Sequence, residues 1–262
     1  MGVRFAQLDK IELPMPPPGA LLFGRNALKN ATPGPWSEAL ANYVRNGGRV
    51  VLLEQDDLPD VLPVPLIQAR ERQTTIAFVR AADHPVLAGL TDADLRWWAD
   101  DHYVSRSNFR KPVAGNWLPL ADVGTMEGTL ETPLLEEYDG QGSWLLCQFL
   151  LTDKAGVAPG ATQLLQNLLN YLAAPAAFRM PGRTALFIGT NTALQAALTA
   201  SQLVAEDLAD RPDALKRADF EVAIADASAL NDKLADILRA FAADGGRILL
   251  QGATPEQQPA LE

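Results

Sequence analysis

The chain has 262 residues, enough for one large domain or two modest ones at roughly 150 residues each. Its composition, 48% hydrophobic and 21% charged, is that of a globular protein and excludes a disordered one. Acidic residues outnumber basic ones by 32 to 22, so we expect no nucleic-acid partner, because binding to phosphates depends on clustered lysine and arginine. No apolar run approaches the roughly 18 residues of a membrane span, and the first residues lack a signal-peptide layout. The sequence as written therefore predicts a cytoplasmic chain with no membrane partner.

Few residues are available for metal or disulfide chemistry. Cys147 is the one cysteine, which excludes an intrachain disulfide and a zinc site built from cysteines. His84 and His102 are the two histidines. We accordingly expect no cofactor.

Short apolar strands alternate with amphipathic helices over the first two thirds of the chain, which is typical of an α/β protein with a mainly parallel sheet. Pro35 suits the first position of a helix, and Gly47 suits the residue that ends one. The elements predicted here are, in chain order, a strand at 20–23, a helix from Pro35 to the Asn46-Gly47-Gly48 stop, strands at 49–53 and 74–79, loops with one or two short strands over 105–142, a strand at 143–150 and a helix at 161–172.

Residues 173–181 contain two prolines and no hydrophobic period, so we predict a domain boundary there, between a domain at 1–174 and a second at 182–262. The α/β pattern then restarts. The elements predicted in the second domain are a strand at 184–188, a helix at 192–205, a strand at 220–224, a helix over 230–241 and a strand at 247–250.

One string of the sequence recurs. Residues 47–53 read Gly-Gly-Arg-Val-Val-Leu-Leu and residues 245–250 read Gly-Gly-Arg-Ile-Leu-Leu, at an offset of 198 after a helix in each case. An offset this long predicts two related domains in tandem rather than a solenoid. The first lacks the strand and helix that open the second, and the second ends where the first continues, so we expect a fragment of a longer protein. An unpaired strand edge favours association, and we expect the chain to dimerise, form a higher oligomer or exchange segments between copies.

Asp100, Asp101 and His102 form the most polar group near aromatic residues. A carboxylate beside an imidazole orients it for acid–base catalysis, which makes His102 and Asp101 candidate catalytic residues. Glu54 follows a strand whose carboxyl end should face the same crevice, so these four residues are also candidate metal ligands. The alternative is that Asp101 and His102 fix a long loop through hydrogen bonds.

Two further sets of residues allow a functional and a structural interpretation. Cys147 is a candidate nucleophile, but it lies within an apolar strand, where a free cysteine behaves as a small buried hydrophobe. Trp98, Tyr103 and Trp117 would suit a sugar-stacking platform, yet clustered aromatic residues also fill cores under long loops.

Several stretches resemble the class I glutamine amidotransferase-like fold, which is flavodoxin-like, in the form found in non-catalytic domains of β-galactosidases and related glycoside hydrolases. The β-galactosidase trimerisation domain is an example. The resemblance implies a three-layer α/β fold. It is carried by residues 47–53 after a helix, 84–90 (His-Pro-Val-Leu-Ala-Gly-Leu), 98–102 (Trp-Ala-Asp-Asp-His) and 145–149 (Leu-Leu-Cys-Gln-Phe) before a leucine-rich helix.

The resemblance also implies the loss of a catalytic triad. Active members carry a cysteine on a strained turn directly after the strand, where this chain reads Leu-Glu-Gln-Asp-Asp at 53–57. Active members also carry a histidine and a glutamate after Gln-Phe, where Gln148-Phe149 is followed here by Leu-Leu-Thr. The resemblance therefore implies a non-catalytic accessory or assembly module, with a glycosidase catalytic domain or a carbohydrate as possible partner. Two alternatives remain open: a hydrolase of esters, phosphoesters or glycosides that uses Asp101 and His102 or a carboxylate-held metal, and a carbohydrate-binding module.

Overall fold

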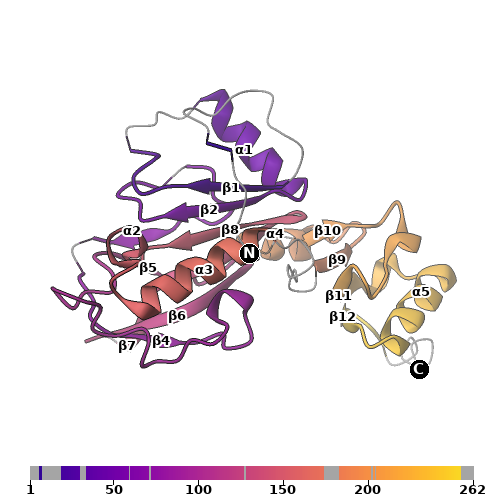
Figure 1. Cartoon of the computed structure of the whole chain (residues 1–262). Coiled ribbons are helices and arrows are strands. Elements are labelled where there is room, and N and C mark those ends of the chain that lie inside the picture. The colour runs from indigo at the N-terminus through magenta and orange to yellow at the C-terminus, as the bar shows by residue number, and fades with distance from the viewer. Residues whose placement is uncertain are drawn as a thin grey trace. The chain divides into compact units, whose positions relative to one another are not determined.

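The computed structural model of the chain divides into two units, Met1–Arg179 and Met180–Glu262 (Figure 1). Both units are mixed α/β structures. Among the residues that the structure describes, no helix is long and apolar enough to cross a membrane. The described residues are 6–7, 19–29, 34–58, 60–70, 72–126, 128–173, 183–201, 203 and 205–254.

The first unit contains an eight-stranded mixed sheet. Strands β1, β2 and β8 are parallel neighbours, and the other pairs of strands are antiparallel. The order is β1-β2-β8-β7-β5-β3, with β6 paired to β7 and β4 paired to β6. The elements are β1 (Ala20–Phe23), α1 (Pro35–Arg45), β2 (Arg49–Leu53), β3 (Ile67–Ala69), β4 (Ala77–Val79), the 3-10 helix η1 (Pro85–Leu87), β5 (Asn108–Arg110), β6 (Trp117–Thr125), β7 (Gly128–Asp139), β8 (Gly142–Cys147), α2 (Leu151–Lys154) and α3 (Pro159–Ala173).

Helices cover both faces of this sheet, and each face has its own core. On one face, Leu40 and Val44 of α1 pack against Val50, Leu52 and other side chains of β2 and β8. On the other face, leucines of α3 pack against the alternate residues of the same strands. Helix α3 runs across the front of the sheet in Figure 1. Because both sides of β2 are covered, all five of its residues are buried, as the apolar run Val-Val-Leu-Leu after Arg49 predicts for the last four.

The second unit contains a four-stranded sheet in which all strands are parallel, in the order β10-β9-β11-β12. Helix α5 packs on one face through Leu234, Leu238 and Phe241. The elements are β9 (Arg183–Phe187), α4 (Thr192–Ala200), β10 (Ala205–Asp207), the 3-10 helix η3 (Pro212–Ala214), β11 (Phe220–Asp226), the 3-10 helix η4 (Ala227–Ala229), α5 (Asp232–Ala243) and β12 (Arg247–Gln251).

The repeated string forms the same turn in both units. After α1, the amide of Gly47 donates to the carbonyl of Val44, and the amide of Gly48 donates to that of Tyr43. After α5, the residues 198 positions later make the same two hydrogen bonds, from Gly245 to Ala242 and from Gly246 to Phe241. Gly47 and Gly245 both have positive φ, which a glycine adopts without strain. In each unit the second glycine lies so close to the aromatic ring at the end of the helix that a Cβ would overlap it. The relation between the two whole units stays a prediction.

The structure corrects the expectation of long loops over 105–142. Strands β5, β6 and β7 occupy most of this segment, and β6 and β7 form a long antiparallel hairpin. The sequence obscures β7 because its second half carries acidic residues that are nevertheless buried. The hairpin also makes the first sheet mixed, so the expected parallel arrangement holds for β1, β2, β8 and the second unit.

The structure also shortens the helix expected at 192–205. Helix α4 ends at Ala200, where the hydroxyl of Ser201 donates to the carbonyl of Leu198, and residues 205–207 form strand β10.

Gly142 begins β8 where the chain passes closest to the end of α1. A Cβ at this position would overlap the backbone carbonyl oxygens of Gly48 and Val44, which are unable to move aside as a flexible side chain would. We expect Gly142→Ala to destabilise the fold by about 2 kcal/mol or more in urea unfolding. Gly124→Ala is the matched control, because nothing lies within 4 Å of the added methyl group, and it should change the stability by less than about 0.5 kcal/mol. Equal stabilities of the two variants would contradict this account of the junction.

Candidate functional site

Ligands of open α/β sheets bind beyond the carboxyl ends of the parallel strands. In the first unit this edge is formed by the residues that follow β1, β2 and β8. Here Nη1 of Arg25 lies 2.7 Å from Oδ1 of Asp153, and Nη1 of Arg106 lies 3.0 Å from Oδ2 of the same carboxylate. We call this group the carboxyl-edge cluster. Its members are Arg25, Glu54, Asp101, Arg106, Thr152, Asp153 and Lys154.

Asp101 belongs to this cluster through basic side chains. Its Oδ1 lies 2.7 Å from Nζ of Lys154, which is buried and also donates to the carbonyl of Ala99, and its Oδ2 lies 3.6 Å from Arg106. The hydrogen bond from Lys154 is the main cause that lowers the pKa of the Asp101 carboxyl. His102 is exposed, with a positive φ, and the contacts of the described residues include no hydrogen bond between its ring and Asp101. The carboxylate of Asp101 is therefore bound by Lys154 and Arg106, and not by the imidazole of His102 that the sequence suggested.

Glu54 lies at the buried centre of the carboxyl-edge cluster. The carboxylate is buried, and its Oε2 accepts a 2.6 Å hydrogen bond from Oγ1 of Thr152, while its Oε1 has no hydrogen-bond partner in the described part of the chain. Burial raises the pKa of Glu54, and the hydrogen bond from Thr152 partly opposes the shift. The thiol of Cys147 is 1% exposed, and burial, followed by the charge of Glu54, raises its pKa far above the ordinary value. This environment opposes formation of a thiolate.

The side chain of Gln55 closes the turn after β2. Its Nε2 donates to the carbonyls of Gly24, at 2.8 Å, and Leu53, while its Oε1 accepts from the amide of Leu28 at 3.1 Å. Its backbone carbonyl accepts from Nε2 of Gln148 at 2.9 Å. The same carbonyl also accepts from Nε2 of Gln68 at 2.6 Å, so Gln55 takes part in five hydrogen bonds that hold the turn.

The structure does not assemble the four candidate metal ligands. Glu54 is bonded to Thr152, and Asp101 is bonded to Lys154. Within the described parts of the chain, no three His, Cys, Asp or Glu side chains are grouped as a metal site requires. Asp100 adopts a positive φ in the loop before Asp101 and His102.

The predicted aromatic platform is divided between different environments. Trp98 is 2% exposed, donates its indole N–H to the carbonyl of Asp94 at 2.7 Å, and packs against Phe149, so it belongs to the core. Trp117 begins β6 and is partly buried. Tyr103 lines an open hollow of about 370 Å³.

The hollow places hydrogen-bonding side chains beside the ring of Tyr103. Arg72, Asn108 and Glu131 line it as well. Glu131 lies 3.1 Å from Nη1 of Arg72, and Nδ2 of Asn108 lies 3.3 Å from the same carboxylate. Tyr103 and these polar residues make the hollow a candidate surface for a polar ligand.

Sequence reasoning missed a buried polar network around Glu136. This carboxylate is fully buried and accepts hydrogen bonds from the hydroxyls of Ser143 at 2.5 Å, Tyr138 at 2.9 Å and Tyr171 at 3.0 Å. Nε2 of His84 lies 3.1 Å from its Oε2. Burial and the neighbouring Glu136 raise the pKa of both tyrosines. The network joins η1, β7, β8 and α3.

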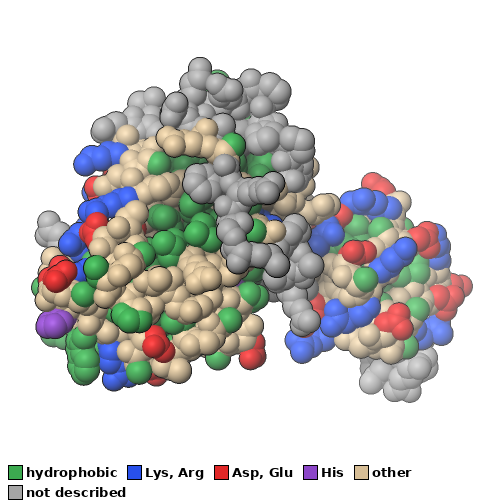
Figure 2. All heavy atoms as spheres, viewed as in Figure 1, with side chains coloured by type: hydrophobic (Ala, Val, Ile, Leu, Met, Phe, Trp, Pro, Cys, Tyr) green, Lys and Arg blue, Asp and Glu red, His purple; other side chains and the backbone are tan. Residues whose placement is uncertain are grey.

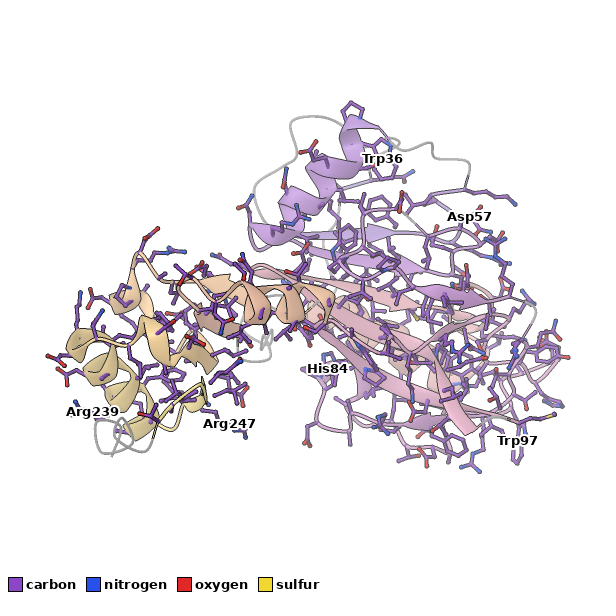
Figure 3. The ribbon with its side chains drawn as sticks, turned by 180° about the vertical axis from the view of Figure 1, so that it is seen from behind. Trp36, Asp57, His84, Trp97, Arg239 and Arg247 are labelled. Atoms are coloured by element: carbon purple, nitrogen blue, oxygen red, sulfur yellow. The ribbon has the colours of Figure 1, made fainter. Side chains whose placement is uncertain are left out.

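The hydrogen bonds of His84 define its role in this network. Its Nδ1 accepts from the amide of Val86 at 3.3 Å, which assigns the ring proton to Nε2 and thus a donor role toward Glu136. His84 lies at the opposite end of the first unit from Asp57 and Trp97 (Figure 3). This end carries the amino termini of β2 and β8, opposite the carboxyl edge of the parallel strands. The network is therefore a structural connection between η1, β7, β8 and α3.

Glu137 has a different environment, although it is the next residue of β7. It is fully buried, and among the described residues neither carboxylate oxygen has a hydrogen-bond partner. The residue opposite on β8 is Trp144, whose indole nitrogen is also without one. Burial, with a smaller contribution from Asp139, raises the pKa of Glu137 to about 8.

The raised pKa of Glu137 predicts a loss of stability as the pH rises. The unfolded chain releases this proton near the ordinary value of 4.5 and the folded chain near 8, so unfolding becomes more favourable between these values. Glu137→Gln should abolish this dependence and be more stable at pH 8 by on the order of 3 kcal/mol in urea unfolding. Glu38→Gln, on the exposed face of α1, should follow the wild type. A Glu137→Gln protein with the wild-type pH profile would contradict the assignment.

No protein-family model matches the sequence, and no curated protein matches it significantly. Among solved structures, the chain is similar to the cytoplasmic protein STM3548 from Salmonella typhimurium, with 17% identity and a TM-score of 0.39 over 59% of this chain and 70% of that chain. It is similar to the cytoplasmic protein STM1381 from Salmonella typhimurium LT2, with 15% identity and a TM-score of 0.36 over 59% and 72% of the two chains. It is also similar to a β-galactosidase from Rahnella sp. R3, with 12% identity and a TM-score of 0.35 over 58% of this chain and 21% of that one. TM-scores this low identify neither the fold family nor the function of this chain.

Proposed function

We propose that the chain is a non-catalytic assembly module on a framework that resembles the class I glutamine amidotransferase-like fold, of the kind attached to glycoside hydrolases. The observation that carries the proposal is the closed turn after β2. A nucleophile at this turn would need an exposed sulfur beside the amino terminus of a helix. The turn of this chain carries Gln55 instead of a cysteine, and the side chain of Gln55 is hydrogen-bonded to the backbone of Gly24, Leu28 and Leu53.

The second half of the carboxyl edge supports the same proposal. Where an active framework would carry its histidine and glutamate, the chain continues into α2, and Thr152 donates its hydroxyl to Glu54. Cys147 belongs to the hydrophobic core on the α3 face of the sheet. Structural contacts thus occupy the positions where acyl-transfer chemistry would be expected.

Burial of Cys147 predicts an unreactive thiol. We expect native protein at neutral pH to leave a disulfide reagent such as DTNB unreacted, and protein unfolded in urea to release one equivalent of thionitrobenzoate. Leu22→Cys places a second cysteine on the half-exposed surface of β1, and that thiol should react at once in the native state. Rapid reaction of the native wild-type thiol would overturn the proposal.

The hydrolase alternative is tested on the same protein. Wild type and His102→Ala are assayed on activated aryl esters, phosphoesters and glycosides, and we expect both to show no turnover above the uncatalysed rate. Turnover that His102→Ala abolishes, while the circular dichroism spectrum is retained, would show that the chain is an enzyme.

The hollow beside Tyr103 favours carbohydrate binding as the second candidate function. Pyranose rings present C–H surfaces to aromatic faces and hydroxyls to side chains such as Asn108 and Glu131. This candidate is compatible with an accessory module, because both place ligand recognition outside a catalytic centre.

Replacement of two neighbouring aromatic residues separates binding from stability. Tyr103→Ala should weaken saccharide binding about tenfold, or about 1.4 kcal/mol, with little change in melting temperature. Trp98→Ala should instead lower the melting temperature sharply, because a core tryptophan contributes about 3–5 kcal/mol. The measurements are isothermal titration with mono- and disaccharides and thermal unfolding. Unchanged saccharide affinity in Tyr103→Ala would exclude the hollow as the site.

A further inference from the structure

Trp97 is an exposed tryptophan with an unfavourable backbone conformation. It is 59% exposed, and its φ of 52° lies in the left-handed region. Among the described residues other than glycine, those that share a positive φ are Asn26, Asp100 and His102. Asparagine, aspartate and histidine adopt this region more readily than other residues, whereas a bulky side chain is strained there. The chain therefore carries a tryptophan where a glycine would be less strained.

The described contacts of the indole ring do not compensate for this strain. The guanidinium of Arg96 lies over the ring, with Cζ 5.7 Å from the centroid. A cation over an exposed ring is a weak interaction, and it offsets only part of the cost of a left-handed backbone. Other strongly exposed apolar residues of the first unit, such as Ile67 and Val157, do not have a positive φ. Strain that contacts within the fold do not repay is typical of functional sites, which makes the exposed ring a candidate for recognition.

The loop of residues 97–103 is fixed from beneath. Trp98 belongs to the core, and the buried Nζ of Lys154 donates to the carbonyl of Ala99 and the carboxylate of Asp101, at 2.7 Å each. A loop held in this way needs little ordering when a ligand binds, which favours affinity. In Figure 2, an exposed histidine lies beside hydrophobic side chains at the left margin of the first unit. The exposed residues of the loop are Trp97, Asp100, Asp101 and His102.

This loop is hydrogen-bonded to the wall of the hollow beside Tyr103. The amide of Trp97 donates to the carbonyl of Thr75 at 2.9 Å, and the amide of Val104 donates to the carbonyl of Thr74 at 2.7 Å. Thr74 and Tyr103 both line the hollow. Both ends of the loop are therefore bonded to the segment that forms the wall, and Trp97 is bonded one residue beyond it.

We propose that the site takes a carbohydrate chain, with one sugar ring in the hollow and the next ring stacked on Trp97. This inference rests on the carbohydrate-binding function proposed above, and it names the ligand as an oligosaccharide of at least two rings. A sugar ring presents C–H groups to an aromatic surface and hydroxyls to polar side chains. Trp97 supplies the exposed aromatic surface, and Asp100 and His102 supply exposed hydrogen-bonding groups on the same loop.

Calorimetric titration with sugars of increasing length tests the proposal. The two series are glucose, cellobiose and cellotriose, and galactose with its β-1,4-linked di- and trisaccharide. We expect one series to bind the wild type, with an affinity that rises about tenfold from the monosaccharide to the disaccharide. Trp97→Ala should lose this gain and keep the affinity for the monosaccharide, because only the second ring contacts residue 97. The matched control is Leu249→Ala in the second unit, where the exposed fraction is 58%, and it should bind like the wild type.

Urea unfolding separates recognition from a structural role of the ring. Trp97→Ala should unfold at the same urea concentration as the wild type, because the described ring contact is the exposed one with Arg96. Trp97→Gly should unfold at a higher concentration than Trp97→Ala, because glycine adopts the left-handed φ without strain. A marked loss of stability in Trp97→Ala, or a Trp97→Gly protein less stable than Trp97→Ala, would overturn the proposal.

The binding data distinguish failure of this inference from failure of the function on which it rests. Monosaccharide binding that Tyr103→Ala weakens, with no gain from chain length and no effect of Trp97→Ala, would reject the second ring and leave the carbohydrate function standing. A wild type that binds no sugar of either series would reject both. A Trp97→Ala protein with altered oligomeric state in light scattering and unaltered affinity for every sugar would show that Trp97 contacts protein instead. These outcomes leave the burial of Cys147, and with it the non-catalytic framework, unaffected.

Discussion

Exclusion of water where β2 and β8 end is the constraint on which the rest of the first unit depends. Cys147 lies inside the sheet, and Glu54 lies beside it. One carboxylate oxygen of Glu54 is hydrogen-bonded to Thr152, and the other has no partner among the described residues. Ionising either group in this environment costs free energy, because charge is poorly solvated in a nonpolar interior. A framework with this interior is suited to hold its strands in place. It is poorly suited to generate a nucleophile.

Polar side chains at both ends of the same sheet serve the fold. At the amino ends of the parallel strands, Glu136 collects three hydroxyl donors and one imidazole donor, and so connects the hairpin of β6 and β7 to α3. At the carboxyl ends, Arg25 and Arg106 share Asp153. Partly exposed pairs of this kind contribute little stability, typically below about 1 kcal/mol, but they fix the loops that carry them. A surface for recognition is then to be sought elsewhere, in the hollow beside Tyr103.

Local signals were sufficient to predict part of this structure. Pro35, the helical period of α1 and the two glycines after it lie within a few residues of one another, and α1 and β2 form as expected. The burial of β7 depends on partners far along the chain. The buried carboxylate of Glu136 needs hydrogen bonds from His84 and Tyr171, which lie far from it in the sequence. No local sequence pattern reveals that these residues will supply hydrogen bonds to an acidic strand. The same limit applies to Asp101, whose sequence neighbour suggested an imidazole partner and whose spatial partner is Lys154.

The pKa of the Glu54 carboxyl is the most direct measure of burial at the carboxyl ends of β2 and β8. The titration of this carboxyl is followed by the ¹³C chemical shift of the side-chain carboxyl carbon in labelled protein, with Thr152→Val as the comparison. The account predicts a pKa above the ordinary glutamate value in the wild type and a higher one in Thr152→Val, because the lost hydrogen bond stabilises the charged form. A carboxyl that titrates at or below the ordinary value would show that water reaches this edge, and would contradict the closed framework.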